Sequence, residues 1–388
     1  MYKILCLNKI SSIGTDRFGS SYEYGTEMEK PDGILVRSAS MHDMTFDENL
    51  KAIARAGAGV NNIPLDTCTE QGIVVFNTPG ANANAVKELV IASLFLTSRK
   101  IPAAMDWVKT LKGQGSEVGK LVEKGKSNFG GPEIKGKTLG VIGLGAIGIL
   151  VANAAKHLGM TVYGYDPYLS VDAAWSLSHG VQKAESLEEI FQKSDYITLH
   201  LPLTDDTKNL IGKENFTKMK DGVRILNFAR GELVHSVDML NALADGKVAA
   251  YATDFPTDEL IGAENVIAIP HLGASTPESE DNCAVMAVEQ IKDYLENGNI
   301  KNSVNLPALS MPRDGSSIRI CIIHKNVPNT IANLTAICGR AGLNIEHMQN
   351  SSRKSYAYTI LDVTGTVSDS DIQAISALDE IIRIRVIR

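Results

Sequence analysis

Reactive side chains occur at three places in the second half of the sequence. Arg230, the acidic pair Asp258–Glu259 and His271 each come shortly after an apolar run with strand character. Histidine exchanges a hydroxyl proton near neutral pH, and a carboxylate behind the ring would orient it. An arginine fork binds a carboxylate and polarises the neighbouring oxygen better than lysine does. Singly, these residues also fit a surface ion pair, a solvated turn and a capping or core histidine. Together they predict hydride transfer at the carbinol carbon of a hydroxy acid.

A glycine-rich turn, Gly143–Gly148, would position these groups. It stands between a strand-like run at 138–142 and a helix predicted for 149–158, and the next strand-like run, 160–165, ends at Asp166. Glycines at such a turn let backbone N–H groups approach a pyrophosphate at the helix N-terminus. An acid at this distance binds both ribose hydroxyls and repels a 2′-phosphate, so the unit predicts NAD rather than NADP. The turn residues assigned to NAD are Gly143, Gly145, Ala146, Ile147 and Gly148.

A separate α/β domain is predicted before the glycine turn, because the turn begins only at position 143. Polar or glycine-rich groups starting at Arg37, Gly57 and Asn77 follow three of its strand-like runs. Ligands of parallel sheets bind outside the carboxyl ends of strands, so we expect substrate loops here, although each alone also fits an ordinary turn. The candidate strands are Ile4–Leu7, Gly33–Val36, Ala52–Ala54 and Ile73–Phe76.

Two long helices flank the predicted NAD-binding domain. One covers 85–99, and the other begins at Pro277, after Ser275–Thr276, and ends at Gly298. The simplest geometry inserts one domain into another, with a cleft between them as the expected site. We predict a Rossmann-type doubly wound NAD-binding domain at 100–277, inserted into a flavodoxin-like α/β substrate-binding domain at 1–99 and 278–306.

The C-terminal part has a different periodicity. Residues 307–315 resemble a linker, and 316–388 alternate strands and helices in the order βαββαβ, which predicts a ferredoxin-like module. This module contains no obvious catalytic set, so binding or regulation is its expected role.

Composition excludes several other classes of protein. The chain has 388 residues, of which 44% are hydrophobic and 21% charged, as in ordinary soluble proteins. Its net charge of −7 without a basic cluster argues against nucleic acid as a partner. The five scattered cysteines lack metal-ligand spacing, which predicts reduced thiols in a cytoplasmic protein and no metal. The apolar stretches 4–7 and 89–96 are too short for a signal peptide and a membrane span.

Several motifs together resemble a known family. The glycine turn and the segments 227–231 and 271–276 are similar to the signatures of NAD-dependent D-2-hydroxyacid dehydrogenases. Within this family, Arg37–Ser38, 54–62 and 77–80 resemble the branch that oxidises 3-phospho-D-glycerate. The last module resembles an ACT domain, an amino-acid-sensing unit.

The resemblance implies Arg230 as the anchor of the substrate carboxylate, His271 as acid/base, and one member of the acidic pair as its carboxylate. The sequence leaves two choices, since counting from Asp254 selects Glu259, whereas aligning on Phe-Pro-Thr selects Asp258. We predict Glu259, because counting from Asp254 also preserves the number of residues that usually separates this carboxylate from the arginine, here Arg230.

Further roles follow from the resemblance. It implies Asp254 near the nicotinamide amide and a serine-sensing pattern in the last module, where Asn329 replaces a usual glycine at a turn. Asparagine tolerates positive φ better than most residues. The implied residues are Thr78, Pro202, Thr207, Ala229, Asp254 and Gly273 for NAD with Asp166 on the ribose, Arg37, Ser38, Gly59 and Asn61 for substrate, and His324, Asn326 and Asn344 for serine.

The resemblance thus predicts NAD-dependent oxidation of 3-phospho-D-glycerate to 3-phosphooxypyruvate, the entry step to L-serine. Two rivals are a dehydrogenase of another D-2-hydroxyacid and an NAD-sensing scaffold without catalysis; a serine-binding protein is a third. We expect a small-molecule substrate, possible inhibition by L-serine, no nucleic-acid or membrane partner, and a homo-oligomer that is at least a dimer.

Overall fold

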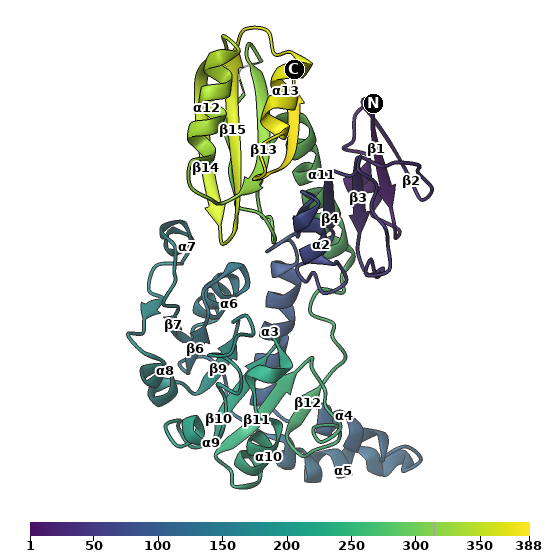
Figure 1. Cartoon of the computed structure of the whole chain (residues 1–388). Helices are drawn as coiled ribbons and strands as arrows, with labels where there is room; N and C mark the ends of the chain where they lie inside the picture. Colours follow the sequence, from purple (N-terminus) through teal and green to yellow (C-terminus); the bar gives the residue numbers. More distant parts are fainter. Residues whose placement is uncertain (314) are drawn as a thin grey trace. The chain divides into compact units, whose positions relative to one another are not determined.

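The computed structural model describes residues 1–313 and 315–388, so Asp314 of the predicted linker lies outside the described residues. The chain forms two compact units. The first contains 1–82 and 277–388, and the second contains 83–276 (Figure 1). The second unit is therefore inserted into the first. No helix of the described residues is long and apolar enough to cross a membrane.

The observed boundaries differ from the predicted ones. The helix at Ala83–Ser98 clusters with the second unit rather than with the first, where the prediction of 1–99 had put it. Its buried side chains, including Val90 and Leu94, share a core with the strand Thr138–Ile142 of the second unit. The C-terminal module is not separated from the rest of the first unit by the predicted linker. It belongs to that compact unit and shares a hydrophobic core with it.

The first unit is built on a five-stranded parallel sheet in the order β2-β1-β3-β4-β5, a flavodoxin-like order. The prediction missed one edge strand, β2, because its sequence Tyr-Glu-Tyr-Gly is half polar and mostly not buried. The long helix α11 covers one face of this sheet and buries Val288, Ile291 and Leu295 there. The elements are β1 (Tyr2–Cys6), α1 (Ser12–Thr15), β2 (Tyr22–Gly25), β3 (Gly33–Val36), β4 (Ala52–Arg55), α2 (Leu65–Glu70), β5 (Val74–Phe76) and α11 (Pro277–Asn297).

The second unit has a seven-stranded parallel sheet in the order β12-β11-β10-β9-β6-β7-β8. This is the doubly wound Rossmann order, with β6 and β9 side by side at the point where the direction of winding reverses. Strands β6 to β12 are Thr138–Ile142, Thr161–Tyr165, Gln182–Lys183, Tyr196–Leu199, Val223–Asn227, Val248–Thr253 and Val266–Ala268. The helices are α3 (Ala83–Ser98), α4 (Ile101–Lys109), α5 (Val118–Gly125), α6 (Ala146–His157), α7 (Val171–Trp175), α8 (Leu187–Lys193), α9 (Lys213–Phe216) and α10 (Ser236–Ala244), with short 3₁₀ turns at Gly115–Glu117, Lys126–Phe129 and Gly231–Leu233.

The region 109–136 is rich in glycine and lysine, and it contains regular structure. It contains α5 and two short 3₁₀ turns, although none of their residues is buried. Its glycines and lysines obscured a local amphipathic pattern, Val118-Gly-Lys-Leu-Val-Glu-Lys-Gly, which is compatible with a surface helix.

The C-terminal module has the predicted βαββαβ order and a four-stranded antiparallel sheet, β14-β15-β13-β16. Alternate residues of β13 face opposite sides: Ile320 and Ile322 pack beneath α12 and α13, whereas Cys321 and Ile323 join the core around α11. Both faces of this sheet are thus covered. The elements are β13 (Ile318–Lys325), α12 (Thr330–Arg340), β14 (Asn344–Arg353), β15 (Tyr356–Thr364), α13 (Asp369–Ser376) and β16 (Ile381–Ile387).

Candidate nucleotide and substrate sites

The glycine turn connects β6 to α6, as predicted. Gly143 has a φ of +93°, and a Cβ there would lie 2.5 Å from the His200 carbonyl oxygen. A Cβ at Gly148 would lie 1.9 Å from the carbonyl oxygen of Gly143. Both positions therefore need glycine for the fold of the turn itself.

Gly145 differs from these two glycines. Its backbone is extended, it is exposed, and a Cβ there would meet no atom within 4 Å. The protein's own packing thus does not require glycine at this position, which caps the N-terminus of α6. Close approach of a pyrophosphate to the backbone does require it. The turn therefore fits a dinucleotide.

Asp166 follows β7 and holds the turn. Its carboxylate accepts hydrogen bonds from the backbone amides of Leu144, at 2.9 Å, and Tyr168, at 2.8 Å. A carboxylate has about four lone-pair sites, so capacity remains for two ribose hydroxyls. Asp166 is only partly buried, and the structure brings it directly to the glycine turn.

His200 lies at the end of β9, next to the glycine turn. Its Nε2 is 3.0 Å from the Thr198 hydroxyl, while its Nδ1 is buried and has no hydrogen-bond partner in the described parts of the chain, 1–313 and 315–388. A proton on Nδ1 would therefore be a buried, unpaired donor. Burial lowers the pKa of His200 from 6.5 to about 3.

This environment predicts a pH-dependent stability of the second unit. Between pH 6.5 and 3 the unfolded chain binds a proton at His200 that the folded chain does not bind, so stability falls as pH falls through this window. Relative to His200→Asn, the wild type should lose about 2–3 kcal/mol between pH 7 and pH 4. Urea unfolding followed by fluorescence of Trp107 and Trp175, both in the second unit, measures this difference. Parallel pH curves for the two proteins would contradict the assignment to His200.

The three segments with candidate catalytic side chains each follow a strand of the Rossmann sheet, and these strands are neighbours. Arg230 follows β10, Asp254 follows β11 and His271 follows β12, and these strands are adjacent in the sheet. Arg230 is exposed, and the backbone around it is fixed by the buried Asn227. The Asn227 amide donates to the Arg230 carbonyl at 2.8 Å and accepts from the Ala229 amide at 3.2 Å. Asn227 is thus a positioning residue that the sequence prediction did not single out.

Asp254 is the carboxylate that the structure brings to His271. It is 1% exposed and accepts from the Gly273 amide at 3.2 Å, and its second oxygen, Oδ1, is buried without a partner among the residues that the structure describes. Burial raises the pKa of Asp254, and the nearby His271 and Arg230 oppose this rise. The His271 ring packs against Phe255, with ring centroids 4.8 Å apart.

The count along the sequence selected Glu259 for this role instead. Glu259 and Asp258 are exposed. A hydrogen bond from its own backbone amide lowers the pKa of Glu259. After the buried Asp254 the chain becomes exposed at Pro256, so burial and the count along the sequence select different carboxylates.

The remaining predicted NAD residues are distributed over both units. In the second unit, the Thr207 hydroxyl donates to the Pro202 carbonyl at 2.8 Å, which closes the loop after β9. A Cβ at Gly273 would lie 3.2 Å from Asp254 Oδ2, so this position favours glycine. In the first unit, Thr78 is completely buried and its hydroxyl has no partner within the described residues.

The predicted substrate residues lie at the carboxyl ends of β3 and β4. Arg37 and Ser38 are exposed after β3, while Gly59 and Asn61 lie in the loop after β4. A Cβ at Gly59 would lie 2.7 Å from the Arg55 guanidinium, so glycine leaves room for this cation. The sequence prediction missed Asn8, whose side-chain oxygen accepts the successive backbone amides of Arg37, Ser38 and Ala39 at 2.9–3.1 Å.

The predicted serine-sensing residues do not share one environment. His324 is 2% exposed and bonded to the Thr359 hydroxyl at 2.9 Å, so its side chain is internal to the module. Asn326 and Asn344 are exposed, and their amides donate to the Lys354 carbonyl and to Glu346. Asn329 has a φ of +69°, which confirms the positive φ tolerated by asparagine.

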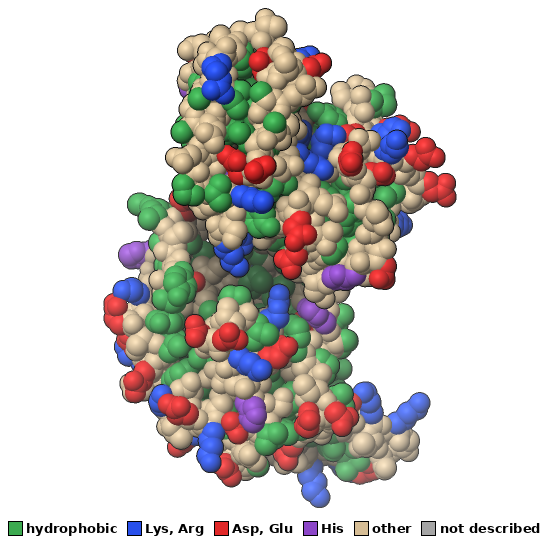
Figure 2. All heavy atoms as spheres, in the orientation of Figure 1, with side chains coloured by type: hydrophobic (Ala, Val, Ile, Leu, Met, Phe, Trp, Pro, Cys, Tyr) green, Lys and Arg blue, Asp and Glu red, His purple; other side chains and the backbone are tan. Residues whose placement is uncertain are grey.

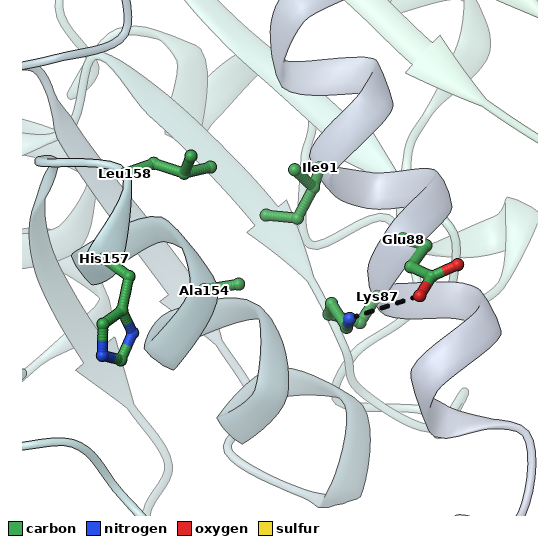
Figure 3. A pocket seen from close by; sticks show the side chains of 6 residues that line it. All are labelled: Lys87, Glu88, Ile91, Ala154, His157 and Leu158. Atoms are coloured by element: carbon green, nitrogen blue, oxygen red, sulfur yellow. Dashed lines mark ion pairs between the residues drawn. The ribbon is translucent and has the colours of Figure 1, made fainter.

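A pocket of about 370 Å³ lies between α3 and α6 on the second unit (Figure 3). Lys87, Glu88 and Ile91 line it from α3, and Ala154, His157 and Leu158 line it from the end of α6. It contains none of the predicted site residues. The glycine turn is at the opposite end of α6, about 16 Å along the helix.

On the face seen in Figure 2, acidic and basic side chains are interspersed.

Comparison with known proteins first defines the class of the fold. Residues 91–273 match the family described as "D-isomer specific 2-hydroxyacid dehydrogenase, NAD binding domain". The chain therefore has the α/β, Rossmann-like fold of a D-2-hydroxyacid dehydrogenase, and the predicted cofactor, NAD, agrees with this family.

The similar proteins are more specific. The chain is 39% identical over 300 residues to D-3-phosphoglycerate dehydrogenase of Methanocaldococcus jannaschii. The matched region covers 74% of this chain and 54% of the relative. The chain is 37% identical over 329 residues to the Bacillus subtilis enzyme of that name, with 80% and 60% covered. The chain thus spans little more than half the length of these relatives. The NAD⁺-bound crystal structure of 3-phosphoglycerate dehydrogenase in Entamoeba histolytica matches with a TM-score of 0.59 and 29% identity, over 79% of this chain and 99% of that chain.

Proposed function

We propose that the protein is an NAD-dependent dehydrogenase that oxidises 3-phospho-D-glycerate to 3-phosphooxypyruvate, the first step of L-serine biosynthesis. The observation that carries this proposal is the arrangement of Arg230, Asp254 and His271 at the ends of three adjacent strands, in a sheet whose glycine turn fits a dinucleotide. The name shared by the relatives at 37–39% identity supports the choice of substrate.

Each residue has a proposed role in this reaction. Bound NAD supplies the acceptor of the hydride. His271 takes the hydroxyl proton, and Arg230 binds the substrate carboxylate and polarises the neighbouring oxygen. Asp254 supports His271, because it is buried and directly precedes Phe255, whose ring packs against His271. Glu259 remains the alternative from the sequence count. Asp166 binds the ribose, and Thr78, Pro202, Thr207, Ala229 and Gly273 line the cofactor together with the glycine turn.

The substrate phosphate requires cationic or backbone N–H donors. We propose that Arg37, Arg55 and the backbone amides of 57–62 bind it, with Ser38, Gly59 and Asn61 facing the substrate. The Arg55 Nε donates to the Arg37 carbonyl at 2.9 Å, so the last residue of β4 is linked to the loop after β3. Burial lowers the pKa of Arg55, and an anionic ligand would offset the cost of keeping this cation partly buried.

The proposal extends to regulation and assembly. The C-terminal module would act as an ACT domain that binds L-serine through His324, Asn326 and Asn344, and the protein would be a cytoplasmic homo-oligomer, at least a dimer. The antiparallel βαββαβ module supports the first of these roles.

The deciding experiment follows NADH formation with 3-phospho-D-glycerate, D-glycerate and D-lactate, each with and without L-serine. We expect turnover confined to the phosphorylated acid and inhibition by serine. Turnover only with an unphosphorylated acid would replace the substrate by another D-2-hydroxyacid. NAD binding without any turnover would favour a non-catalytic scaffold.

A further inference from the structure

Helix α11 is hydrogen-bonded to the substrate loops through Gln290. This side chain is 7% exposed, and its Nε2 donates to the Asn77 carbonyl at 3.0 Å and to the Met286 carbonyl of its own helix at 3.1 Å. Asn77 is the first residue after β5 and precedes Thr78. Gln290 thus fixes the start of the loop that follows this strand.

The same loop is bonded to the next one. The Asn77 side chain donates to the Ala58 carbonyl at 2.6 Å, and the Thr78 amide donates to the Gly57 carbonyl at 3.1 Å. From there, Arg55 donates to the Arg37 carbonyl. The three loops at the carboxyl ends of β3, β4 and β5 therefore form one connected set.

This set returns to α11 at a second point. The Arg37 guanidinium pairs with Glu280, in the first turn of α11, at 2.6 Å. Both partners are largely exposed, with 44% and 46% of their side chains accessible, so this contact contributes little. The buried bond from Gln290 is the stronger of the two connections.

The C-terminal end of α11 is held by the module. Its last carbonyls accept hydrogen bonds from Arg385, at Tyr294 and Leu295, and from Arg319, at Asn297. Cationic donors at this end also complement the helix dipole. The helix is thus fixed independently of Gln290, and a change at Gln290 would act on the loop rather than move the helix.

Packing alone does not explain a glutamine at this position. The Gln290 Oε1 is buried and has no hydrogen-bond partner within the described residues. Burying an unpaired amide oxygen is unfavourable, so an apolar residue of the same size would suit the core better. What glutamine adds is the donor to Asn77.

We infer that Gln290 is a positioning residue for substrate, which acts through Asn77 on the loops after β4 and β5. This inference rests on the proposed function for its kinetic readout. Substrate affinity depends on these loops, whereas Arg230 and His271, in the other unit, perform the chemistry. Loss of the Gln290 donor therefore changes substrate binding and leaves the chemical step and the NAD turn intact.

The test compares Gln290→Met with Ile291→Val, a matched control on the same helix whose side chain packs in the core. Gln290→Met is expected to raise the KM for 3-phospho-D-glycerate about five- to tenfold, with kcat within about twofold and the Kd for NAD unchanged. Hydrogen exchange of the amides at 57–61, 77, 78 and 80 should become faster in Gln290→Met only. Gln290→Leu, which also removes the donor and adds no buried polar group, replaces Gln290→Met if the latter does not fold.

The outcomes separate the two proposals. Equal KM values and equal exchange rates in Gln290→Met and Ile291→Val would overturn the positioning role. A wild type that does not oxidise 3-phospho-D-glycerate would overturn the proposed function, and the exchange measurement would still decide whether Gln290 orders the loops. A fall in kcat equal to that in kcat/KM would also contradict the inference, since it would mean that the chemical step had changed.

Discussion

Replacing His271 with glutamine is expected to lower kcat by roughly a hundred- to ten-thousandfold. Glutamine keeps the capacity to hydrogen-bond but cannot exchange the hydroxyl proton of the substrate. His271 is exposed after β12, so the substitution should cost little stability, and the glycine turn that fits NAD lies after a different strand. Steady-state NADH formation measures the loss, and fluorescence titration with NAD should give an unchanged Kd. A kcat within about threefold of wild type would exclude His271 as the acid/base.

The supporting carboxylate can be identified in the same assay. Asp254→Asn removes the buried charge next to His271 and Arg230, whereas Glu259→Gln changes an exposed side chain. We expect the first variant to lose at least tenfold in kcat and the second to stay close to wild type. A loss in Glu259→Gln equal to or larger than that in Asp254→Asn would restore the assignment made from the sequence count.

Much of the fold was predictable because its signals are local. The strand, glycine turn, helix and acid at 138–166 lie within one short segment, and the alternation in β13 follows from neighbouring residues. The missed elements lack such signals. Strand β2 is half polar and lies at a sheet edge, and α5 buries no residue. The domain boundary was misplaced because the sequence of α3 does not reveal which core its apolar side chains join.

The site was predictable to the level of strands but not of side-chain partners. The carboxyl ends of parallel strands meet at one sheet edge, which is why Arg230 and His271 could be grouped. The choice of carboxylate depends on the path of the backbone after Asp254, which spacing does not determine. Asn8 and Gln290 bond to residues far away in the sequence, so no local pattern indicates them.

The largest expected effect on stability comes from Arg319, which joins the module to α11. Its guanidinium is fully buried and forms a bidentate pair with the buried Asp362, with both N–O distances at 2.7 Å. Three further bonds, each of 2.8 Å, go to the carbonyls of Asn297, Met311 and Pro312. These five bonds use all five N–H donors of an arginine. Hydrogen bonding to Asp362 raises the pKa of Arg319, so it stays charged.

Arg319→Met should therefore lower the free energy of unfolding of the first unit by about 3–5 kcal/mol, because it leaves the Asp362 charge and three carbonyls without their donor. Arg319→Lys, with three donors instead of five, should fall between this variant and wild type. Arg17→Met is the matched control, since Arg17 pairs with Glu289 on α11 at the surface, where about half of each side chain is exposed, and it should cost less than about 1 kcal/mol.

The two units allow this prediction to be checked within one experiment. Both tryptophans, Trp107 and Trp175, belong to the second unit, so tryptophan fluorescence follows that unit, whereas circular dichroism follows the whole chain. Urea unfolding of Arg319→Met should show an earlier transition by circular dichroism and an unchanged midpoint by fluorescence. Because α11 carries both the contact to Arg319 and Gln290, the same variant should also raise the KM for 3-phospho-D-glycerate. An unfolding curve like that of Arg17→Met would mean that the module is an appendage, and that the substrate-binding unit keeps its fold without this buried contact.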